Sequence, residues 1–358
     1  MTGGTPEASW RSRAARELLR RSASTALRLP RPLVSWIAGG APPVLEGQPL
    51  DPQVHAVLAS HRRLALPTMD TLAVDEARSA FLEQSALLDA ERVSMAECRE
   101  LSVPGAAGPL PARLYVPRGA QHPGPALVYF HGGGFVVGDL DSHDRFCRFL
   151  ADRSGVRLLA VAYRLAPEHP FPAAPDDALA AWRWVTDDPS RIGAAPGRLA
   201  VGGDSAGGNL AVVASLDARA AGGPLPTFAL LIYPALDLTR SSVSHRTFAE
   251  GYLLTGRLMD WFLDHYAPDA SDRRHPRASP LLVDDLRGLP PTYLVTAGYD
   301  PLRDEGRRFA DRLRDAGVPV RYDHQAGLVH GFIAMLGGVA RARQAADELA
   351  AVLREALG

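Results

Sequence analysis

The chain has 358 residues, 46% of them hydrophobic, which suffices for one large α/β domain with an inserted or appended subdomain, or for two ordinary domains. Its formal net charge is −1, so no overall field favours nucleic acid or an acidic partner. All 39 basic residues are arginine, which excludes lysine Schiff bases, Ser-Lys dyads and a P-loop lysine.

Cysteine content and hydropathy point to a protein without metal, cofactor or membrane anchor. Cys98 and Cys147 are too few for a disulfide framework and lack metal-ligand spacing, so we expect two partly buried thiols. There is no apolar run of about 18 residues, the length that a transmembrane helix needs. The pair Arg20-Arg21 is not followed by a sustained apolar segment, so a twin-arginine signal is not indicated. We therefore expect a cytoplasmic protein.

Residues 1–90 are predicted to form an N-terminal extension and cap helices, because prolines divide them into short segments such as the helix over 52–63. The first part is basic and interleaved with apolar side chains. Its arginines are Arg11, Arg13, Arg16, Arg20, Arg21, Arg28 and Arg31. We expect such a segment to pack on the cap, or against a partner subunit of a possible homodimer. Contact with an anionic membrane surface is the alternative.

Residues 91–236 and 289–358 are predicted to form an α/β core in two parts. An antiparallel edge hairpin is expected over 97–103 and 112–116. Five short apolar runs are typical of buried parallel strands: 126–130, 157–163, 198–202, 228–233 and 292–297. Helical stretches separate several of them, at 142–153, 175–185, 209–220 and 302–316. This alternation predicts a mostly parallel sheet with helices on both faces.

The interval over residues 237–288 is too long for a plain crossover between two strands. Apolar side chains recur in it at helical spacing, which predicts a cap insertion. Together with the N-terminal helices, it should cover the carboxyl ends of the strands, where open α/β sheets bind ligands.

Two glycine-rich motifs indicate acyl-transfer chemistry. Residues 131–135 read His-Gly-Gly-Gly-Phe, and residues 203–208 read Gly-Asp-Ser-Ala-Gly-Gly between a predicted strand and a predicted helix. The second motif is a G-x-S-x-G nucleophile elbow, and the first is the oxyanion loop that accompanies it. The nucleophile is then Ser205, and the N–H groups of Gly133, Gly134 and Ala206 are the candidate oxyanion donors. We expect His131 to hold the loop by hydrogen bonding.

The order Ser, acid, His predicts the remaining members of a triad. Asp300 is the first acidic residue after the predicted strand over 292–297, whereas Asp304 and Glu305 would already lie on the following helix. Two histidines come later in the chain. His324 alternates within a strand-like run, which favours a structural role, while His330 lies in a loop behind that run. We therefore predict Ser205, Asp300 and His330 as the catalytic residues.

With these residues placed, the chain resembles the bacterial hormone-sensitive-lipase-like esterases of the α/β-hydrolase superfamily. The matching stretches are 131–135, 163–172, 203–208, 300–305 and 329–332. The resemblance covers about residues 50–358. It implies the capped α/β-hydrolase fold, the same triad and oxyanion hole, and no metal or cofactor. Residues 163–172 are a family marker that we expect to shape the sheet edge and the cap contact, with Glu168 and His169 structural. The N-terminal segment of ~45 residues is longer than that of many family members.

The resemblance implies a serine carboxylesterase that hydrolyses short- to medium-chain acyl esters of small molecules. Amide hydrolysis of the arylacetamide deacetylase type would use the same residues, and a non-catalytic receptor on this fold is the alternative from another class. Receptors on this fold lack the triad histidine, so the presence of His330 argues against that alternative. The substrate pocket is predicted to be apolar, with contributions from Phe135, Leu253, Leu254, Met259 and Phe262.

Overall fold

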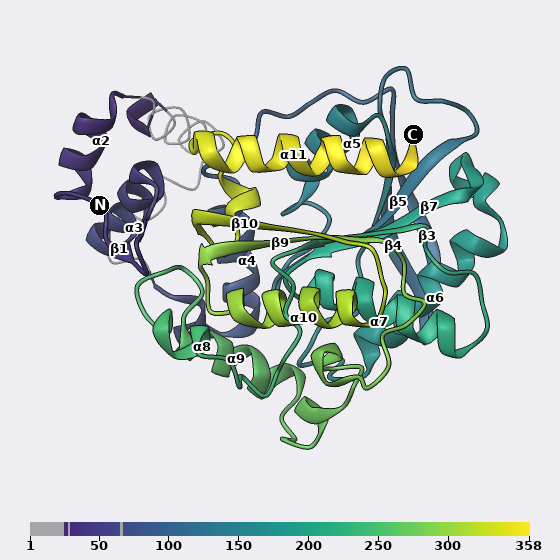
Figure 1. Cartoon of the computed structure of the whole chain (residues 1–358). Helices are drawn as coiled ribbons and strands as arrows, with labels where there is room; N and C mark the ends of the chain where they lie inside the picture. Colours follow the sequence, from purple (N-terminus) through teal and green to yellow (C-terminus); the bar gives the residue numbers. More distant parts are fainter. Residues whose placement is uncertain (1–24, 28, 65–66) are drawn as a thin grey trace, which may run out of the picture.

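The computed structural model describes residues 25–27, 29–64 and 67–358, and Figure 1 shows their arrangement. Most of the basic N-terminal segment, including Arg11 and Arg21, lies outside the described residues. Within the described part, no helix combines the length and the hydropathy that a membrane crossing needs.

One eight-stranded sheet runs through the centre of the molecule, in the order β10-β9-β8-β7-β5-β6-β4-β3. All neighbouring strands are parallel except β3–β4 and β4–β6, which are antiparallel. The predicted mostly parallel sheet with an antiparallel edge hairpin is confirmed. The strands are β3 (Glu97–Gly105), β4 (Gly108–Val116), β5 (Gly124–Phe130), β6 (Arg157–Val161), β7 (Ala194–Asp204), β8 (Phe228–Ile232), β9 (Thr292–Tyr299) and β10 (Val320–Val329).

Helices cover both faces of this sheet (Figure 1). One face carries α5 (Asp144–Ser154) and α11 (Ala340–Leu357), and the other carries α6 (Ala173–Asp187), α7 (Ala206–Ala220) and α10 (Arg303–Asp315). The side chains of β5 show why both layers are needed. Val128 and Phe130 belong to one hydrophobic cluster, whereas Leu127 and Tyr129 belong to the other. Because successive side chains of a strand point to opposite faces, a wholly apolar strand must be covered twice.

Smaller elements surround the sheet, and helices α2, α3, α8 and α9 among them lie toward one end of it in Figure 1. The N-terminal ones are α2 (Arg31–Ala38), β1 (Val44–Leu45), β2 (Gln48–Pro49), α3 (Pro52–Leu64), η2 (Met69–Thr71) and α4 (Val74–Ser85). Those between β8 and β9 are α8 (Ser244–Thr247), α9 (Gly256–Tyr266), η4 (Asp272–Arg274) and η5 (Pro280–Leu282). Two further short helices are η3 (Pro189–Ile192) and η6 (Phe332–Met335). Helix α9 begins where the Thr255 hydroxyl accepts a hydrogen bond from the Leu258 N–H at 3.2 Å.

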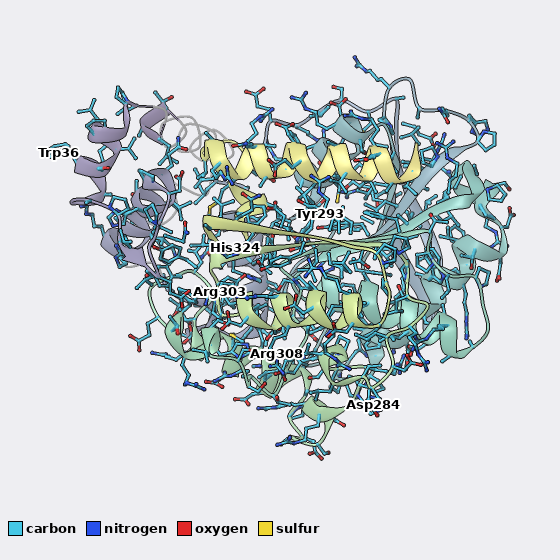
Figure 2. All side chains as sticks on the ribbon, in the orientation of Figure 1. Trp36, Asp284, Tyr293, Arg303, Arg308 and His324 are labelled. Carbon is cyan, nitrogen blue, oxygen red and sulfur yellow. The ribbon has the colours of Figure 1, made fainter. Side chains whose placement is uncertain are left out.

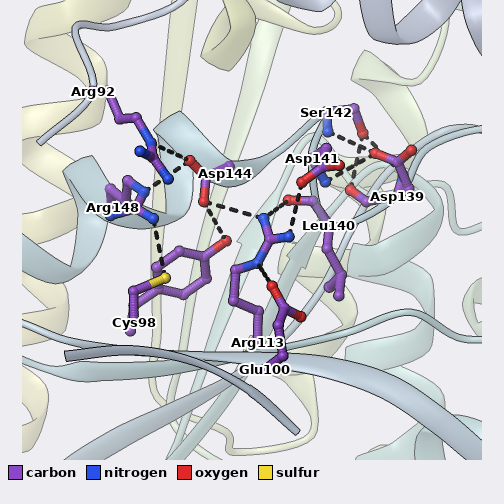
Figure 3. A network of polar contacts seen from close by, with 11 residues as sticks. Arg92, Cys98, Glu100, Arg113, Asp139, Leu140, Asp141, Ser142, Asp144 and Arg148 are labelled. Atoms are coloured by element: carbon purple, nitrogen blue, oxygen red, sulfur yellow. Dashed lines mark hydrogen bonds and ion pairs between the residues drawn. The ribbon is translucent and has the colours of Figure 1, made fainter.

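An arginine network fixes the antiparallel edge hairpin to the helix layer (Figure 3). The guanidinium of Arg113 on β4 donates to Glu100 on β3, to Asp141 at 2.8 Å and to Asp144 on α5 at 3.2 Å. Arg148 on α5 binds the other oxygen of Asp144 at 2.8 Å. One planar cation with several donors can join three elements in this way. The network lies beside the loop that leads from the glycine-rich motif into α5.

The two cysteines differ in their surroundings, which corrects the expectation of two partly buried thiols. Cys147 on α5 is fully buried in the core, whereas Cys98 on the edge strand β3 is exposed. The difference follows from topology, since only one face of an edge hairpin can pack against the body of the protein.

Candidate active site

The nucleophile motif forms a sharp turn between β7 and α7. Ser205 lies at this turn with φ +54° and ψ −118°, a strained conformation for a residue with a side chain. The glycines on both sides permit the turn. A Cβ on Gly203 would lie 2.4 Å from the Phe130 carbonyl oxygen, and one on Gly207 would lie 1.9 Å from the same atom. The motif therefore presents the hydroxyl at the end of the sheet and the start of a helix.

The structure brings Ser205, Asp300 and His330 together from three separate strand ends. Asp300 directly follows β9, and His330 directly follows β10, whose register with β9 shifts between Gln325 and Val329. The His330 Nε2 atom lies 2.9 Å from the Ser205 Oγ, and its Nδ1 atom lies 2.8 Å from the Asp300 Oδ2. Parallel strands end at one edge of the sheet, so residues 125 positions apart meet there.

The hydrogen bonds assign a role to each atom of this group. The Asp300 carboxylate is fully buried, and its other oxygen accepts the Leu302 N–H at 2.8 Å. Because an ionised carboxylate can only accept, Nδ1 of His330 carries the ring proton. Nε2 is then free to accept the hydroxyl hydrogen of Ser205. The arrangement can deprotonate a serine and stabilise the resulting imidazolium.

The alternative candidates have other partners. Asp304 accepts the Ser244 N–H at 2.9 Å, and Glu305 accepts the Leu236 N–H at 2.6 Å while it faces His245 at 2.8 Å. Both carboxylates thus hold the segment that follows β8 onto α10. His324 lies within β10, with its Nδ1 3.2 Å from the Thr296 hydroxyl.

The glycine-rich loop exposes backbone donors next to the serine. Gly133 has φ +122° and Gly134 has φ +59°, and a Cβ on Gly133 would lie 2.1 Å from the Val137 carbonyl oxygen. Across the described part of the chain, the N–H groups of Gly133, Gly134 and Ala206 have no hydrogen-bond acceptor. Such unpaired donors beside a nucleophile can bind the oxygen of a tetrahedral intermediate.

Asp204, the residue before Ser205, holds this loop in place. Its carboxylate is buried, and its Oδ1 accepts the Gly132 N–H at 2.9 Å and the Tyr129 hydroxyl at 2.7 Å. The imidazole of His143 lies 3.4 Å from the same oxygen. Burial alone would raise the pKa of Asp204, but His143 and the hydrogen bonds hold it below its usual value. Sequence reasoning missed this residue, although an acid at the end of a buried strand was a usable signal.

His131 lies at the base of the loop. Its Nδ1 is 2.8 Å from the Gly132 carbonyl oxygen, and its ring stacks on Tyr163 at 4.4 Å between centroids. Tyr163 in turn donates its hydroxyl hydrogen to the His131 carbonyl at 2.7 Å. Burial lowers the pKa of His131 to about 4, so the ring is neutral at physiological pH. These contacts agree with the predicted structural role.

Arg78 on α4 connects the N-terminal helices to the same loop. Its Nε donates to the Val136 carbonyl at 3.0 Å, and its Nη2 donates to the Ala166 carbonyl at 3.0 Å. The guanidinium also forms a two-pronged pair with Glu168, at 2.8 and 2.7 Å. Glu168 thus has a structural partner, as expected of the family-marker segment, and the clamp made by Arg78 reaches the residues just after Gly133 and Gly134.

A cavity of about 1350 Å³ opens over Ser205 and His330. The predicted pocket residues Phe135, Leu253, Leu254, Met259 and Phe262 all line it. The structure adds side chains that sequence reasoning missed, from the N-terminal helices, from the turn after β8 and from α9. These include Val34, Ile37, Ala56, Val57, Tyr233 and Leu258. Phe135 packs flat on Tyr266 with a centroid distance of 3.9 Å, which fixes one wall.

No group of three or more His, Cys, Asp or Glu side chains within the described ranges is arranged to hold a metal ion. Ser205, His330 and the residues of the candidate backbone donors, Gly133, Gly134 and Ala206, all line the cavity.

Comparisons with known proteins agree with this architecture. The profile of the alpha/beta hydrolase fold family matches residues 127–334, more than half of the chain. Carboxylic ester hydrolase LipN of Mycobacterium tuberculosis is 42% identical over 338 residues, which span 91% of this chain and 88% of that protein. Ethyl acetate hydrolase of Pseudomonas putida is 42% identical over 272 residues, with 75% and 85% of the two chains covered.

Solved structures give the same result. An alpha/beta hydrolase enzyme from the metagenome of Lake Arreo superposes with a TM-score of 0.83 at 44% identity, covering 86% of this chain and 98% of that one. The Pyrobaculum calidifontis esterase superposes with a TM-score of 0.79 at 39% identity, covering 86% and 99%. The chain therefore belongs to the alpha/beta hydrolase fold family, as the resemblance to hormone-sensitive-lipase-like enzymes predicted.

Proposed function

We propose that this protein is a serine carboxylesterase in which Ser205, Asp300 and His330 form the catalytic triad. The observation that carries the proposal is the continuous chain of contacts from the Ser205 hydroxyl to the His330 ring, at 2.9 Å, and on to Asp300, at 2.8 Å. The names of the relatives, which include a carboxylic ester hydrolase and an ethyl acetate hydrolase, support the same chemistry.

In the first half-reaction, the Ser205 oxygen attacks the ester carbonyl carbon while Nε2 of His330 takes the hydroxyl proton. Asp300 stabilises the imidazolium that results. The carbonyl oxygen becomes negative and is bound by the N–H groups of Gly133, Gly134 and Ala206. The helix α7 begins at this point, and its N-terminal partial positive charge adds to the stabilisation.

The tetrahedral intermediate collapses when the bond to the alcohol oxygen breaks, and His330 returns its proton to that oxygen. The acyl group is left on Ser205. A water molecule then attacks the acyl carbonyl while His330 again takes a proton. The bond between the acyl carbon and the Ser205 oxygen breaks, His330 returns the proton to that oxygen, and the free acid leaves. Each half-reaction uses the same oxyanion donors, because both pass through a tetrahedral oxyanion.

The substrate class we propose is esters with short to medium acyl chains. The cavity walls come from Leu254, Met259 and Phe262 on one side and from the N-terminal helices on the other, and they favour apolar groups. The same proposal includes a cap and a core. The cap is formed by residues 1–90 and 237–288, and the core by residues 91–236 and 289–358. A cytoplasmic location and a homodimer stay predictions, to be measured by cell fractionation and light scattering.

The proposal is tested with p-nitrophenyl esters whose acyl chains run from acetyl to palmitoyl. Ser205→Ala should lower kcat by about 10⁴-fold or more, because the nucleophile is removed while folding is preserved. Ser215→Ala is the matched control. This serine lies in the same helix α7, where its hydroxyl bonds only the Ala211 carbonyl at 2.8 Å, so activity should persist. Wild-type turnover equal to that of Ser205→Ala would refute the esterase proposal and favour a binding protein.

A paired comparison separates ester from amide hydrolysis. An ester and an anilide with the same acyl group should bind in the same cavity, so their ratio of kcat/KM reports the leaving group alone. We expect the ester to be hydrolysed faster. Faster hydrolysis of the anilide would reassign the chain to the amidase alternative.

A further inference from the structure

The N-terminal helices carry an unusual concentration of exposed apolar side chains. Seven large apolar side chains are exposed among the described residues, and five of them fall between residues 29 and 64. They are Leu29, Leu33, Trp36, Val44 and Leu64. Trp36 is the most exposed at 78%, and Figure 2 shows it pointing away from the body of the protein. Exposed apolar groups that gather in one place mark an interaction surface.

Helix α2 separates this surface from the interior. Leu33 and Trp36 lie three residues apart on α2 and so share one face of the helix, and Leu29 lies just before the helix begins at Arg31. The opposite face packs Val34 and Ala38 into a small cluster with α3 that is distinct from the two main cores. The same helix therefore has a buried apolar face and an exposed one.

The exposed face is also positively charged. Helices α2 and α3 contain no acidic residue, and the last turn of α3 contains Arg62 and Arg63, both exposed. Arg63 donates to the Ile37 carbonyl at the end of α2, which brings the two helix ends side by side. Residues 1–64 carry nine arginines against four acidic residues, whereas residues 65–358 carry 30 against 36. The charge of the chain is thus divided between a basic N-terminal part and an acidic remainder.

We propose that the α2–α3 surface, defined by Leu29, Leu33, Trp36, Arg62 and Arg63, docks on an anionic lipid surface. Basic charge beside exposed aromatic and aliphatic side chains is the combination that holds a helix at such an interface. A tryptophan is suited to this position, because its ring is apolar and its N–H can remain hydrated.

Charge argues against the other occupants. A second copy related by a two-fold axis would bring this surface against itself, so arginine would face arginine. Residues 1–24 of the same chain carry five arginines and two glutamates, and would add positive charge to a face that has no acidic partner on α2 or α3. An anionic lipid surface alone supplies the opposite charge together with an apolar layer.

Docking there would place the ester cavity next to the lipid. Val34 and Ile37 of α2 and Ala56 and Val57 of α3 line the cavity that contains Ser205. Helices α2 and α3, which lie between the cavity and the solvent, are therefore the elements that would contact the lipid. Access of lipid-dissolved esters to Ser205 rests on the proposed function, whereas docking itself does not.

Binding is measured on the full-length Ser205→Ala variant, by co-sedimentation with vesicles of phosphatidylglycerol mixed with phosphatidylcholine and with vesicles of phosphatidylcholine alone. We expect binding to the anionic vesicles at low salt and weaker binding as salt is raised. Leu33→Ser with Trp36→Ser should lower the partition coefficient about tenfold or more. Arg62→Gln with Arg63→Gln should lower it by about fivefold for each charge removed.

Val243→Ser with Leu282→Ser is the matched control, because it removes two exposed apolar side chains from another part of the surface. Its binding should equal that of the parent. Unchanged melting temperatures show that each variant is folded. The proposal is overturned by absence of binding to anionic vesicles at low salt, by equal binding of the Leu33/Trp36 variant, or by an equal loss in the control. A dimer in light scattering that the Leu33/Trp36 variant abolishes would assign the surface to a second copy. None of these outcomes depends on whether Ser205 is the nucleophile.

Discussion

Replacing Asp204 by asparagine is the sharpest test of how the oxyanion loop is held. The carboxylate accepts hydrogen bonds from Gly132 at 2.9 Å and from Tyr129 at 2.7 Å, and both groups are buried. The amide oxygen of asparagine can accept the same bonds but lacks the charge. A bond to a charged group is worth about 1 kcal/mol more than a neutral one, so two bonds predict a loss of about 2 kcal/mol of unfolding free energy.

The same substitution should lower kcat. Gly132 directly precedes the two glycines whose N–H groups are the proposed oxyanion donors, and a Cβ on it would lie 2.3 Å from Asp204 Oδ2. Loss of one such donor costs about 10²–10³ in rate. Because asparagine weakens the bond to the loop without removing it, we expect a fall in kcat of about tenfold to hundredfold, with little change in KM.

Tyr129→Phe is the control for this experiment. It removes a hydrogen bond to the same Asp204 oxygen, and should cost about 1 kcal/mol of stability, but it leaves the bond to Gly132 intact. Its kcat on p-nitrophenyl butyrate should remain near the wild-type value. Two results would refute the reasoning: an Asp204→Asn enzyme that unfolds earlier but keeps full kcat, or a Tyr129→Phe enzyme that loses as much kcat as Asp204→Asn.

Three further substitutions are predicted to act through named contacts. Burial raises the pKa of Asp89 to about 7, whereas the pKa of an aspartate in the unfolded chain is about 4. Ionisation of the buried side chain therefore lowers the unfolding free energy as pH rises from about 4, and this loss is complete above pH 7. Asp89→Asn should therefore raise the unfolding free energy at pH 8 by on the order of 2 kcal/mol and change it little at pH 4, as urea titrations can check. Phe262→Ala should raise KM severalfold, about the effect of one apolar contact, and spare kcat, because the ring lies against Gly134 in the cavity; steady-state kinetics that show a loss of kcat alone would contradict this. Glu305→Gln should cost about 2 kcal/mol in thermal unfolding, because the charged acceptor of two backbone N–H groups and the partner of His245 is lost; an unchanged melting temperature would show that this pair stabilises nothing.

Much of the fold could be predicted from local sequence patterns. The run over 126–130 has only apolar side chains, and its place as β5 in the centre of a doubly covered sheet follows from that pattern. Helix α7 was expected from residue 209 but begins at Ala206, because the turn at Ser205 leads straight into the helix. Element ends depend on such tertiary geometry more than on propensity.

The supports of the site could not be predicted, because they join residues that are distant in the chain. Asp204 meets Gly132 across 72 positions, and Arg78 meets Glu168 across 90. Asp204 lies at the end of a strand and Arg78 lies on a helix, and the local sequence around each residue does not predict which distant residue it will contact. The extent of the cavity was hidden for the same reason, since the inner faces of α2 and α3 complete it only after the chain has folded back on itself.

The clamp made by Arg78 limits how the enzyme could be shortened. Arg78 holds the Val136 carbonyl, and the Val136 N–H donates to the Gly133 carbonyl at 3.1 Å, so α4 is two hydrogen bonds away from Gly133, a proposed oxyanion donor. Trimming the N-terminus to widen the cavity is therefore compatible with turnover only up to the start of α4 at Val74. Truncation beyond Val74 would widen the cavity further, but it would disturb the geometry of the reaction centre.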